Sequence, residues 1–363
     1  MTGEKWMHDV LNGHEKRCFN MFRMTQSTFR KLVIDLESKY GLLPSERTST
    51  IEKLGIFLYT LSLGASNRQA QEQFQHSGET ISRIFKEVLD AMDGLSRDIL
   101  RPRDPEFKEI PSQIVNDTRC MPHFKDWIGA IDGTHIDIII VSEEDELRYR
   151  GRKGTPTVNV LASCDFDLLF TYVLSGWEGS AHDSQIFLDT ISNSSLNFPK
   201  RLAGKYYLAD KGYPEREGYL TLYHKIRYHQ SKFRGANPRG EREIFNRAHS
   251  SLRSCIERAF GILKARWKIL KELPMYSPQD QNRIIYASCA LHNYIRRSNI
   301  PDPAFVIIDR DPNFIPVEVQ VNDDSNSLQE AHYLSTNEMT KVRNDITTSL
   351  MASRRSTRRR RIS

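Results

Sequence analysis

Residues 127–141 read WIGAIDGTHIDIIIV, and this run of β-branched and other apolar residues predicts a long strand. Two more strand patterns follow it, TPTVNVLASCDF at residues 155–166 and DLLFTYVLSGW at residues 167–177, with a turn at 165–167 between them. Three successive strands favour a meander. The segments on either side have a helical period, so this region decides the fold class.

The chain after the meander alternates between helical and strand patterns. SAHDSQIFLDTISNS (180–194) predicts a helix, KYYLAD (205–210) a fourth strand, and LYHKIRYH (222–229) a weaker fifth one. A long helix is expected over about 248–270, and another over 278–297 beneath the sheet. The predicted fold class is therefore α/β, and the order of elements is compatible with a ribonuclease H-like layout.

Two amphipathic helices are expected near the N-terminus. Thr25 is a residue type that caps a helix, and the helical pattern after it stops at Gly41. Ser49 begins a capping-box pattern, and the apolar period that follows stops at Gly64. These signals place both helices in an all-α region before the sheet.

Residues 66–92 read as a helix, a short turn and a second helix, which is the pattern of a helix-turn-helix. If the second helix enters a DNA groove, its outward residues Ser82, Arg83 and Lys86 contact phosphates or base edges. Two alternatives stay open. The pair can be an ordinary part of a small helical bundle, or its outward residues can face a second protomer or a partner protein.

Composition and pattern divide the chain into five segments. They are a flexible leader without periodicity (1–20), a small all-α DNA-binding or dimerising region of helix-turn-helix type (21–100), a Pro-containing linker (101–125), the α/β domain (126–298) and a flexible tail with an Arg-rich end (299–363). Within the tail, a helix is expected only near 335–354.

The charges are unevenly distributed along the chain. The net charge is +6, and the last ten residues alone contain six Arg and no acid. Residues 200–271 hold 18 Lys and Arg against 6 Asp and Glu, which points to a polyanionic partner. The Arg-rich end predicts a nuclear localisation signal or a nonspecific DNA-binding tail.

Other features exclude several classes of protein. The five Cys are scattered, without a C-x-x-C pair, so neither a disulfide framework nor a zinc module is indicated. The N-terminal residues are polar and no window approaches 18 consecutive apolar residues, so we expect no secretory signal and no membrane partner.

Three acidic residues stand at positions that need an explanation. Asp132 interrupts the first strand, Asp210 ends the fourth, and Glu257 lies in the long helix. If they converge, their oxygens suit Mg²⁺ or Mn²⁺, as two ions that support phosphoryl transfer. Each also has an ordinary interpretation, as a turn residue before Gly133 or Gly212, or as a surface ion pair on a helix. The basic residues expected to hold the DNA phosphates are Arg152, Lys153, Arg253 and Lys264.

Several longer motifs resemble the PIF/Harbinger transposase family, especially its plant members. In order they are WIGAIDGTHIDI, YRGRKGTPTVNVLASCDFD, SGWEGSAHDSQIF, LADKGYP, SCIERAFGILKARWKIL and CALHNYIRR. FQHSGETISRIF also resembles the helix-turn-helix of that family, so the resemblance spans about residues 21–298. Several motifs in register are far more specific than any one of them.

The resemblance implies a ribonuclease H-like fold and a metal-dependent DDE endonuclease that cuts transposon ends and joins them to short target sites. It places the catalytic and metal-binding acids on Asp132 (IDGTH), Asp210 (ADKGY) and Glu257 (IERAFG). Asp183 (GSAHDS) is expected as an accessory acid whose main role is to cap its helix.

The resemblance also implies partners: transposon terminal repeats, target DNA and a separate Myb/SANT-like DNA-binding protein. A nuclear homo-oligomer is expected. The alternative is a domesticated, non-catalytic protein on the same scaffold that acts in chromatin or transcription.

Overall fold

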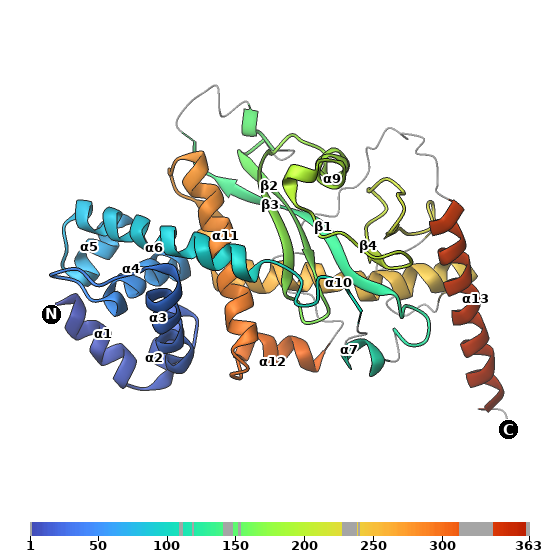
Figure 1. The fold of residues 1–363 in the computed structure, drawn as a ribbon, viewed down its shortest axis with the longest axis horizontal. Coiled ribbons are helices and arrows are strands. Elements are labelled where there is room, and N and C mark those ends of the chain that lie inside the picture. The colour runs from blue at the N-terminus through green and yellow to red at the C-terminus, as the bar shows by residue number, and fades with distance from the viewer. Residues whose placement is uncertain are drawn as a thin grey trace.

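The structure is a computed structural model in which residues 2–108, 112–117, 120–140, 148–151, 154–226, 238, 240–311 and 337–360 are described. A helical region at the N-terminus lies on one side of a mixed sheet, and a C-terminal helix lies at the far end of the molecule (Figure 1). The sheet has helices on both faces. This arrangement confirms a mixed α/β fold with a helical N-terminal region.

The N-terminal region is built from amphipathic helices. They are α1 (Gly3–Asn12), α2 (Glu15–Phe22), α3 (Gln26–Tyr40), α4 (Thr50–Leu63), α5 (Asn67–Phe74) and α6 (Gly78–Ile99). The predicted caps are confirmed: the Thr25 hydroxyl accepts from the backbone N–H of Thr28, and the Ser49 hydroxyl from that of Glu52. Gly41 and Gly64 end α3 and α4 in the left-handed conformation, at φ 72° and 64°.

The prediction of a flexible leader over residues 1–20 was wrong, because α1 and most of α2 lie there. Met7, Val10 and Leu11 are buried, and the Trp6 ring packs edge-on against Phe74 at 5.2 Å. The buried residues of α1 cover only about two helical turns, which is too short for a helical period to be recognised in the sequence. Packing against α4 and α5 stabilises the helix, rather than intrinsic propensity.

The sheet contains β1 (Trp127–Ile138), β2 (Thr157–Cys164), β3 (Phe170–Glu178), β4 (Tyr206–Leu208), β5 (Tyr219–Leu220) and β6 (Glu272–Leu273). Its order is β3-β2-β1-β4-β5, with β6 beside the end of β1. The first three strands pair antiparallel, which confirms the meander, and β4 and β5 continue the sheet in parallel. The fifth strand lies at Tyr219–Leu220 instead of 222–229, of which residues 227–229 are outside the described part.

Helices cover both faces of the sheet. They are α9 (Asp183–Ser192), followed by a 3₁₀ turn at Ser194–Leu196, α10 (Glu241–Arg266), followed by a 3₁₀ turn at Lys268–Lys271, and α11 (Pro278–Arg297), while α7 (Ser112–Val115) precedes β1. Ile131 of β1 packs with Ile186 of α9, whereas its neighbour Ala130 belongs to the cluster that includes α10 and α11. Adjacent side chains of β1 therefore lie on opposite faces of the sheet.

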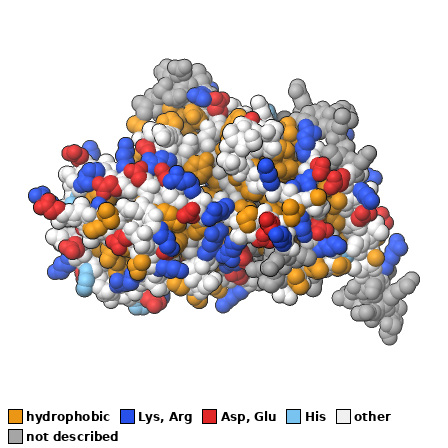
Figure 2. All heavy atoms as spheres, viewed as in Figure 1, with side chains coloured by type: hydrophobic (Ala, Val, Ile, Leu, Met, Phe, Trp, Pro, Cys, Tyr) orange, Lys and Arg blue, Asp and Glu red, His pale blue; other side chains and the backbone are white. Residues whose placement is uncertain are grey.

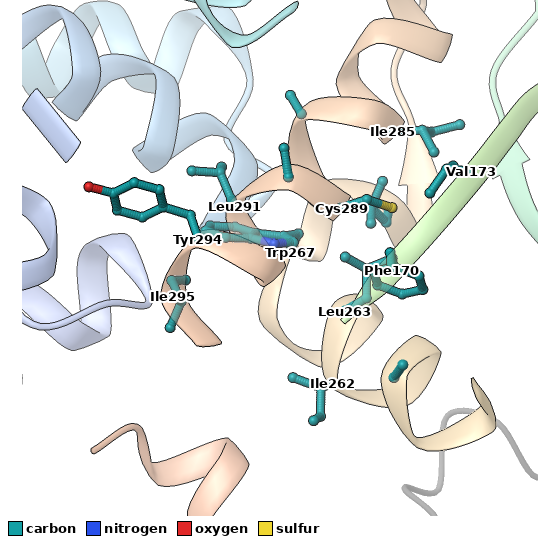
Figure 3. Close-up of a cluster of buried hydrophobic side chains, with 14 of the residues drawn as sticks. Phe170, Val173, Ile262, Leu263, Trp267, Ile285, Cys289, Leu291, Tyr294 and Ile295 are labelled. Carbon is teal, nitrogen blue, oxygen red and sulfur yellow. The ribbon is translucent and has the colours of Figure 1, made fainter. Parts of the chain in front are cut away.

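The helix α11 joins the two parts of the molecule. Its residues Ile285 and Cys289 lie near Phe170 of β3 and Leu263 of α10 in one apolar cluster (Figure 3). On its other side it packs against α6, and its Tyr294 hydroxyl donates to Asp35 of α3 at 2.6 Å. One continuous core therefore runs from the N-terminal helices to the sheet.

The prediction of a flexible tail over 299–363 was wrong for residues 303–310, while residues 312–336 and 361–363 lie outside the described part of the chain. The helix expected near 335–354 is present as α13 (Asn337–Arg360), but an additional helix, α12, spans Pro303–Arg310. Asp302 caps α12 and forms a buried ion pair with Arg266 of α10 at 2.5 Å. Pro303 is the first residue of this helix and Asp302 is its cap.

Candidate active site

The central strand supplies the first acid of the site. Asp132 lies in the middle of β1, opposite Ala162 of β2, and its Oδ1 accepts from the backbone N–H of Gly133 at 2.9 Å. Its Oδ2 accepts from Nη1 of Arg253 at 2.5 Å. The carboxylate therefore faces α10, on the face of the sheet that this helix covers.

Arg253 brings the three predicted acids together. Its Nη2 donates to Oε1 of Glu257 at 2.5 Å, one turn further along α10, and lies 3.9 Å from Oδ1 of Asp210, just after β4. The Arg253 side chain is 9% exposed, and the three carboxylates are 21–26% exposed. Residues 132, 210 and 257, far apart in the sequence, thus surround one guanidinium group.

Asp183 approaches from the other face of the sheet. It is the first residue of α9, and its Oδ1 accepts from Nδ2 of Asn159 on β2 at 2.7 Å. A Cβ atom at Gly133 would lie 2.9 Å from that same oxygen, so glycine at this position permits the carboxylate to reach β1. The expected capping role was wrong, because His182 is the N-cap residue of α9 and the Asp183 carboxylate bonds to β2.

The carboxylates of this site repel one another electrostatically. Burial raises the pKa of Asp132 to about 7, and the nearby charges of Asp210, Glu257 and Asp183 act in the same direction. Arg253 opposes this rise in the pKa of Asp132. Oδ1 of Asp210 is buried and accepts no hydrogen bond from the described residues. Positive charge in addition to Arg253 would be stabilised here.

The donor set suits a hard divalent cation, since it consists of carboxylate oxygens and includes a buried oxygen without a hydrogen bond. Asp132, Asp210 and Glu257 are the residues that could hold such an ion. In their present arrangement, however, the described residues contain no group of three His, Cys, Asp or Glu side chains placed to coordinate a metal. The guanidinium group of Arg253 lies between the carboxylates instead.

The four residues predicted to contact DNA phosphates differ in their surroundings. The Lys264 ammonium group donates to Thr134 and to the backbone carbonyl of His135 at 2.8 and 2.7 Å, which ties α10 to β1. Arg253 forms ion pairs with Asp132 and Glu257. Arg152 and Lys153 lie outside the described residues. Contact of any of these four side chains with DNA stays a prediction.

The helix-turn-helix consists of α5 and α6, with Ser77 capping α6. The Ser82 hydroxyl accepts from Asn67 at 2.9 Å and so joins the two helices. Arg83 and Lys86 are 53% and 64% exposed, and they pair with Glu87 at 2.6 Å and with Asp280 of α11 at 3.8 Å. Two of the three predicted residues are thus exposed, and their contact with DNA stays a prediction.

The surface shows mixed charges on the face in Figure 2, where Lys and Arg side chains are interspersed with acidic ones over the helical region and the sheet. No helix in the described part of the chain has the length and apolar character needed to cross a membrane.

Sequence reasoning missed the role of Arg253 and the contribution of Asn159. The spacing of Arg253 and Glu257, four residues apart on a helix, predicts an ion pair between them. Nothing in the sequence indicates that the same guanidinium group would also reach β1. All residues of β2 are buried, and an Asn within this otherwise largely apolar strand is the signal that could have identified it, because a buried amide needs hydrogen-bond partners.

Comparisons with known proteins identify the family. Residues 131–293 match the family described as "DDE superfamily endonuclease", and residues 1–93 match a "Domain of unknown function (DUF8040)". The human protein "Putative nuclease HARBI1" is 30% identical over 253 residues, which are 69% of this chain and 67% of that protein. The chain belongs to the Harbinger transposase-derived nuclease family.

Two other relatives give the range of similarity. The rat "Putative nuclease HARBI1" is 32% identical over 46% of this chain and 45% of its own length, so the chain matches about half of that relative. The Arabidopsis thaliana "Protein ALP1-like" is 25% identical over 76% of this chain and 70% of its own length. No solved structure matches the chain.

Proposed function

We propose that this protein is a metal-dependent DNA endonuclease of the DDE type, which cuts transposon-end DNA and joins it to target DNA. The observation that carries the proposal is the convergence of Asp132, Asp210 and Glu257 from β1, β4 and α10. We also propose that the sheet domain is ribonuclease H-like. Its strand order, with an antiparallel meander continued by two parallel strands, supports that assignment.

The chain's own residues hold and orient the reaction centre. Asp132, Asp210 and Glu257 would hold Mg²⁺ or Mn²⁺, which activate the attacking oxygen and stabilise the leaving oxygen in an in-line displacement. The strand β1 fixes Asp132, and the helix α10 fixes Glu257, so two of the three oxygen donors lie on rigid elements. Asp183 adds negative charge from the opposite face. Arg253 balances these charges while no metal is bound.

DNA binding, partners and location belong to the same proposal. The exposed Arg83 and Lys86 on α6 and the Arg-rich end of α13 would contact DNA. A homo-oligomer that works with a Myb/SANT-like DNA-binding partner in the nucleus is the assembly that we propose. Family membership and the basic C-terminal sequence support this part.

The experiment that tests the function uses purified protein, with and without the partner protein, on labelled transposon-end DNA in Mg²⁺, in Mn²⁺ and in EDTA. Specific, metal-dependent strand cleavage is the expected result. Supercoiled plasmid DNA in Mn²⁺ provides a second substrate that needs no recognition sequence. Binding to both DNAs without cleavage of either would contradict the endonuclease assignment.

One observation favours a second candidate, a domesticated protein that binds DNA or chromatin without cutting. Arg253 already satisfies Asp132 and Glu257 through ion pairs, so the acid cluster is neutralised in part without a metal. Mn²⁺ titration separates the two candidates. A rise in thermal stability with Mn²⁺ that Asp132→Asn removes supports the endonuclease, and no response supports the non-catalytic protein.

A further inference from the structure

The segment that carries Asp210 leaves the sheet and returns to it. The backbone N–H of Ala209 donates to Leu220 at 3.1 Å, and that of Tyr207 to Gly218 at 2.9 Å, so β5 holds both ends of the excursion. Between them lie Asp210 and, five residues later, Glu215. The position of Asp210 in the site therefore depends on what holds residues 210–218.

The helix α13 supplies that restraint through a buried ion pair. Its Arg343 side chain, 7% exposed, donates to Oε1 of Glu215, which is 9% exposed. The Thr221 hydroxyl donates to the same carboxylate oxygen at 3.3 Å. An ion pair this deeply buried is costly to break, because removal of Arg343 leaves the Glu215 carboxylate buried without this partner.

A second set of contacts fixes Tyr223, shortly after this segment, to both helices. The Tyr223 ring lies against the Arg343 guanidinium group at 5.2 Å, and its hydroxyl donates to Asn344 of α13 at 2.8 Å. Asn246 of α10 accepts from the backbone N–H of Tyr223 at 2.9 Å and donates to its carbonyl at 3.1 Å. Since α10 also carries Glu257, this network connects α13 to two of the three acids.

We propose that α13 positions the active site and that Arg343 is a positioning residue, which holds the segment 210–223 so that Asp210 stays beside Arg253 and Glu257. The inference rests on the proposed nuclease function. The helix lies across α10 beside this part of the sheet (Figure 1). It also lies outside residues 131–293, which match the endonuclease family, so that match assigns it no role.

The test uses the full-length chain with Arg343→Met. Lys341→Met is the matched control, because Lys341 is exposed on the same helix two residues earlier. Tyr223→Phe is a milder second variant that removes only the hydroxyl contacts with α13, and Arg343→Lys tests rescue by a conservative change. Hydrogen–deuterium exchange of peptides over 208–224 is measured without metal or DNA. Nicking of supercoiled plasmid in Mn²⁺ gives kcat and KM.

The expected result for Arg343→Met is exchange about tenfold faster over 208–224 and kcat at least about tenfold lower, with KM for DNA unchanged. Tyr223→Phe should show the same changes more weakly, Arg343→Lys should recover part of kcat, and Lys341→Met should match the wild type. Unchanged exchange in both Arg343→Met and Tyr223→Phe would overturn the proposal.

The failure of the proposed function looks different. If the wild type does not nick DNA under any condition, the nuclease assignment fails, and exchange over 208–224 alone decides whether α13 restrains this segment. If the wild type nicks DNA and Arg343→Met has faster exchange but a normal kcat, α13 stabilises the segment without positioning Asp210, and the positioning role is refuted.

Discussion

Nη1 of Arg253 lies 2.5 Å from Oδ2 of Asp132, although 121 positions separate the two residues in the chain. The same guanidinium group contacts Glu257 at 2.5 Å. A cation from the protein thus lies between two acids that we assign to metal binding. Metal binding at these acids and their ion pairs with Arg253 should therefore compete.

The first prediction concerns Arg253→Gln. Without metal, the variant should lose about 2–4 kcal/mol of unfolding free energy, because partly exposed carboxylates are left without their countercharge. Mn²⁺ should raise the free energy of unfolding, measured with urea, by more in the variant than in the wild type. Arg266→Gln is the control, since it breaks the equally short pair with Asp302 elsewhere on α10. Mn²⁺ should not restore the stability of Arg266→Gln. An equal gain in unfolding free energy for Arg253→Gln and Arg266→Gln would refute the competition between Arg253 and the metal.

The second prediction concerns acid stability. Burial lowers the pKa of His292 to about 3, with the hydrogen bond to the Leu168 carbonyl acting in the opposite direction. Between pH 6.5 and 3 the unfolded chain binds a proton at His292 that the folded chain does not, so stability falls as the pH falls. The loss is about 1.4 kcal/mol per pH unit for this group.

The check is His292→Gln, which should be less stable than the wild type at pH 7.5 but should lose less stability on going to pH 5. His249 contributes a similar slope in both proteins, because burial lowers its pKa to about 3 as well. Urea unfolding at the two pH values gives the comparison. Parallel losses in variant and wild type would show that His292 is not the group responsible.

The third prediction concerns the helix-turn-helix. Arg83→Ala and Lys86→Ala should each weaken DNA binding across sequences and lower the salt slope by about 1, as expected for phosphate contacts. Folding stability should change by less than about 1 kcal/mol, because the Arg83 and Lys86 side chains are exposed. Lys39→Ala, which removes an exposed lysine that pairs with Asp35 on α3, is the control. Unaltered DNA binding in both variants would assign this face of α6 to protein contacts.

The fourth prediction concerns the Arg-rich end. Deletion of residues 354–363 should reduce nuclear import or salt-sensitive DNA affinity. It should leave thermal stability nearly unchanged, because α13 contacts Tyr223 and Glu215 through Arg343, Asn344 and Thr347, which precede the deleted residues. Deletion of residues 337–363 should also lower stability. Confocal imaging of fluorescent fusions and DNA binding at two salt concentrations measure these effects. Normal import and binding without the end would leave it as a solvated terminus.

Much of the fold can be predicted from the sequence because its strongest signals are local. β-branched runs identify β1 and β2, and the capping residues Thr25 and Ser49 locate the starts of α3 and α4. The helices α1 and α12 are short, and tertiary packing and one buried ion pair stabilise them, so no local period reveals them.

The candidate site also has one part that can be predicted from the sequence and one part that depends on the fold. Asp132, Asp210 and Glu257 could be assigned from the motifs around them, and their convergence on one guanidinium group is a property of the fold. Arg253 was interpreted as a DNA contact because a sequence gives its charge but not its partners. The docking of α13 on Glu215 could not be foreseen, since those residues are 128 positions apart.

The central claim is that the three converging acids support metal-dependent DNA cleavage, and the most direct measurement compares wild type with Glu257→Gln on labelled transposon-end DNA in Mg²⁺ and Mn²⁺. Glu37→Gln, an exposed change on α3, is the control. The account predicts cleavage by the wild type and by the control, and at least about 100-fold less by Glu257→Gln with DNA affinity retained. Full cleavage by a folded Glu257→Gln variant at low Mg²⁺ would contradict it.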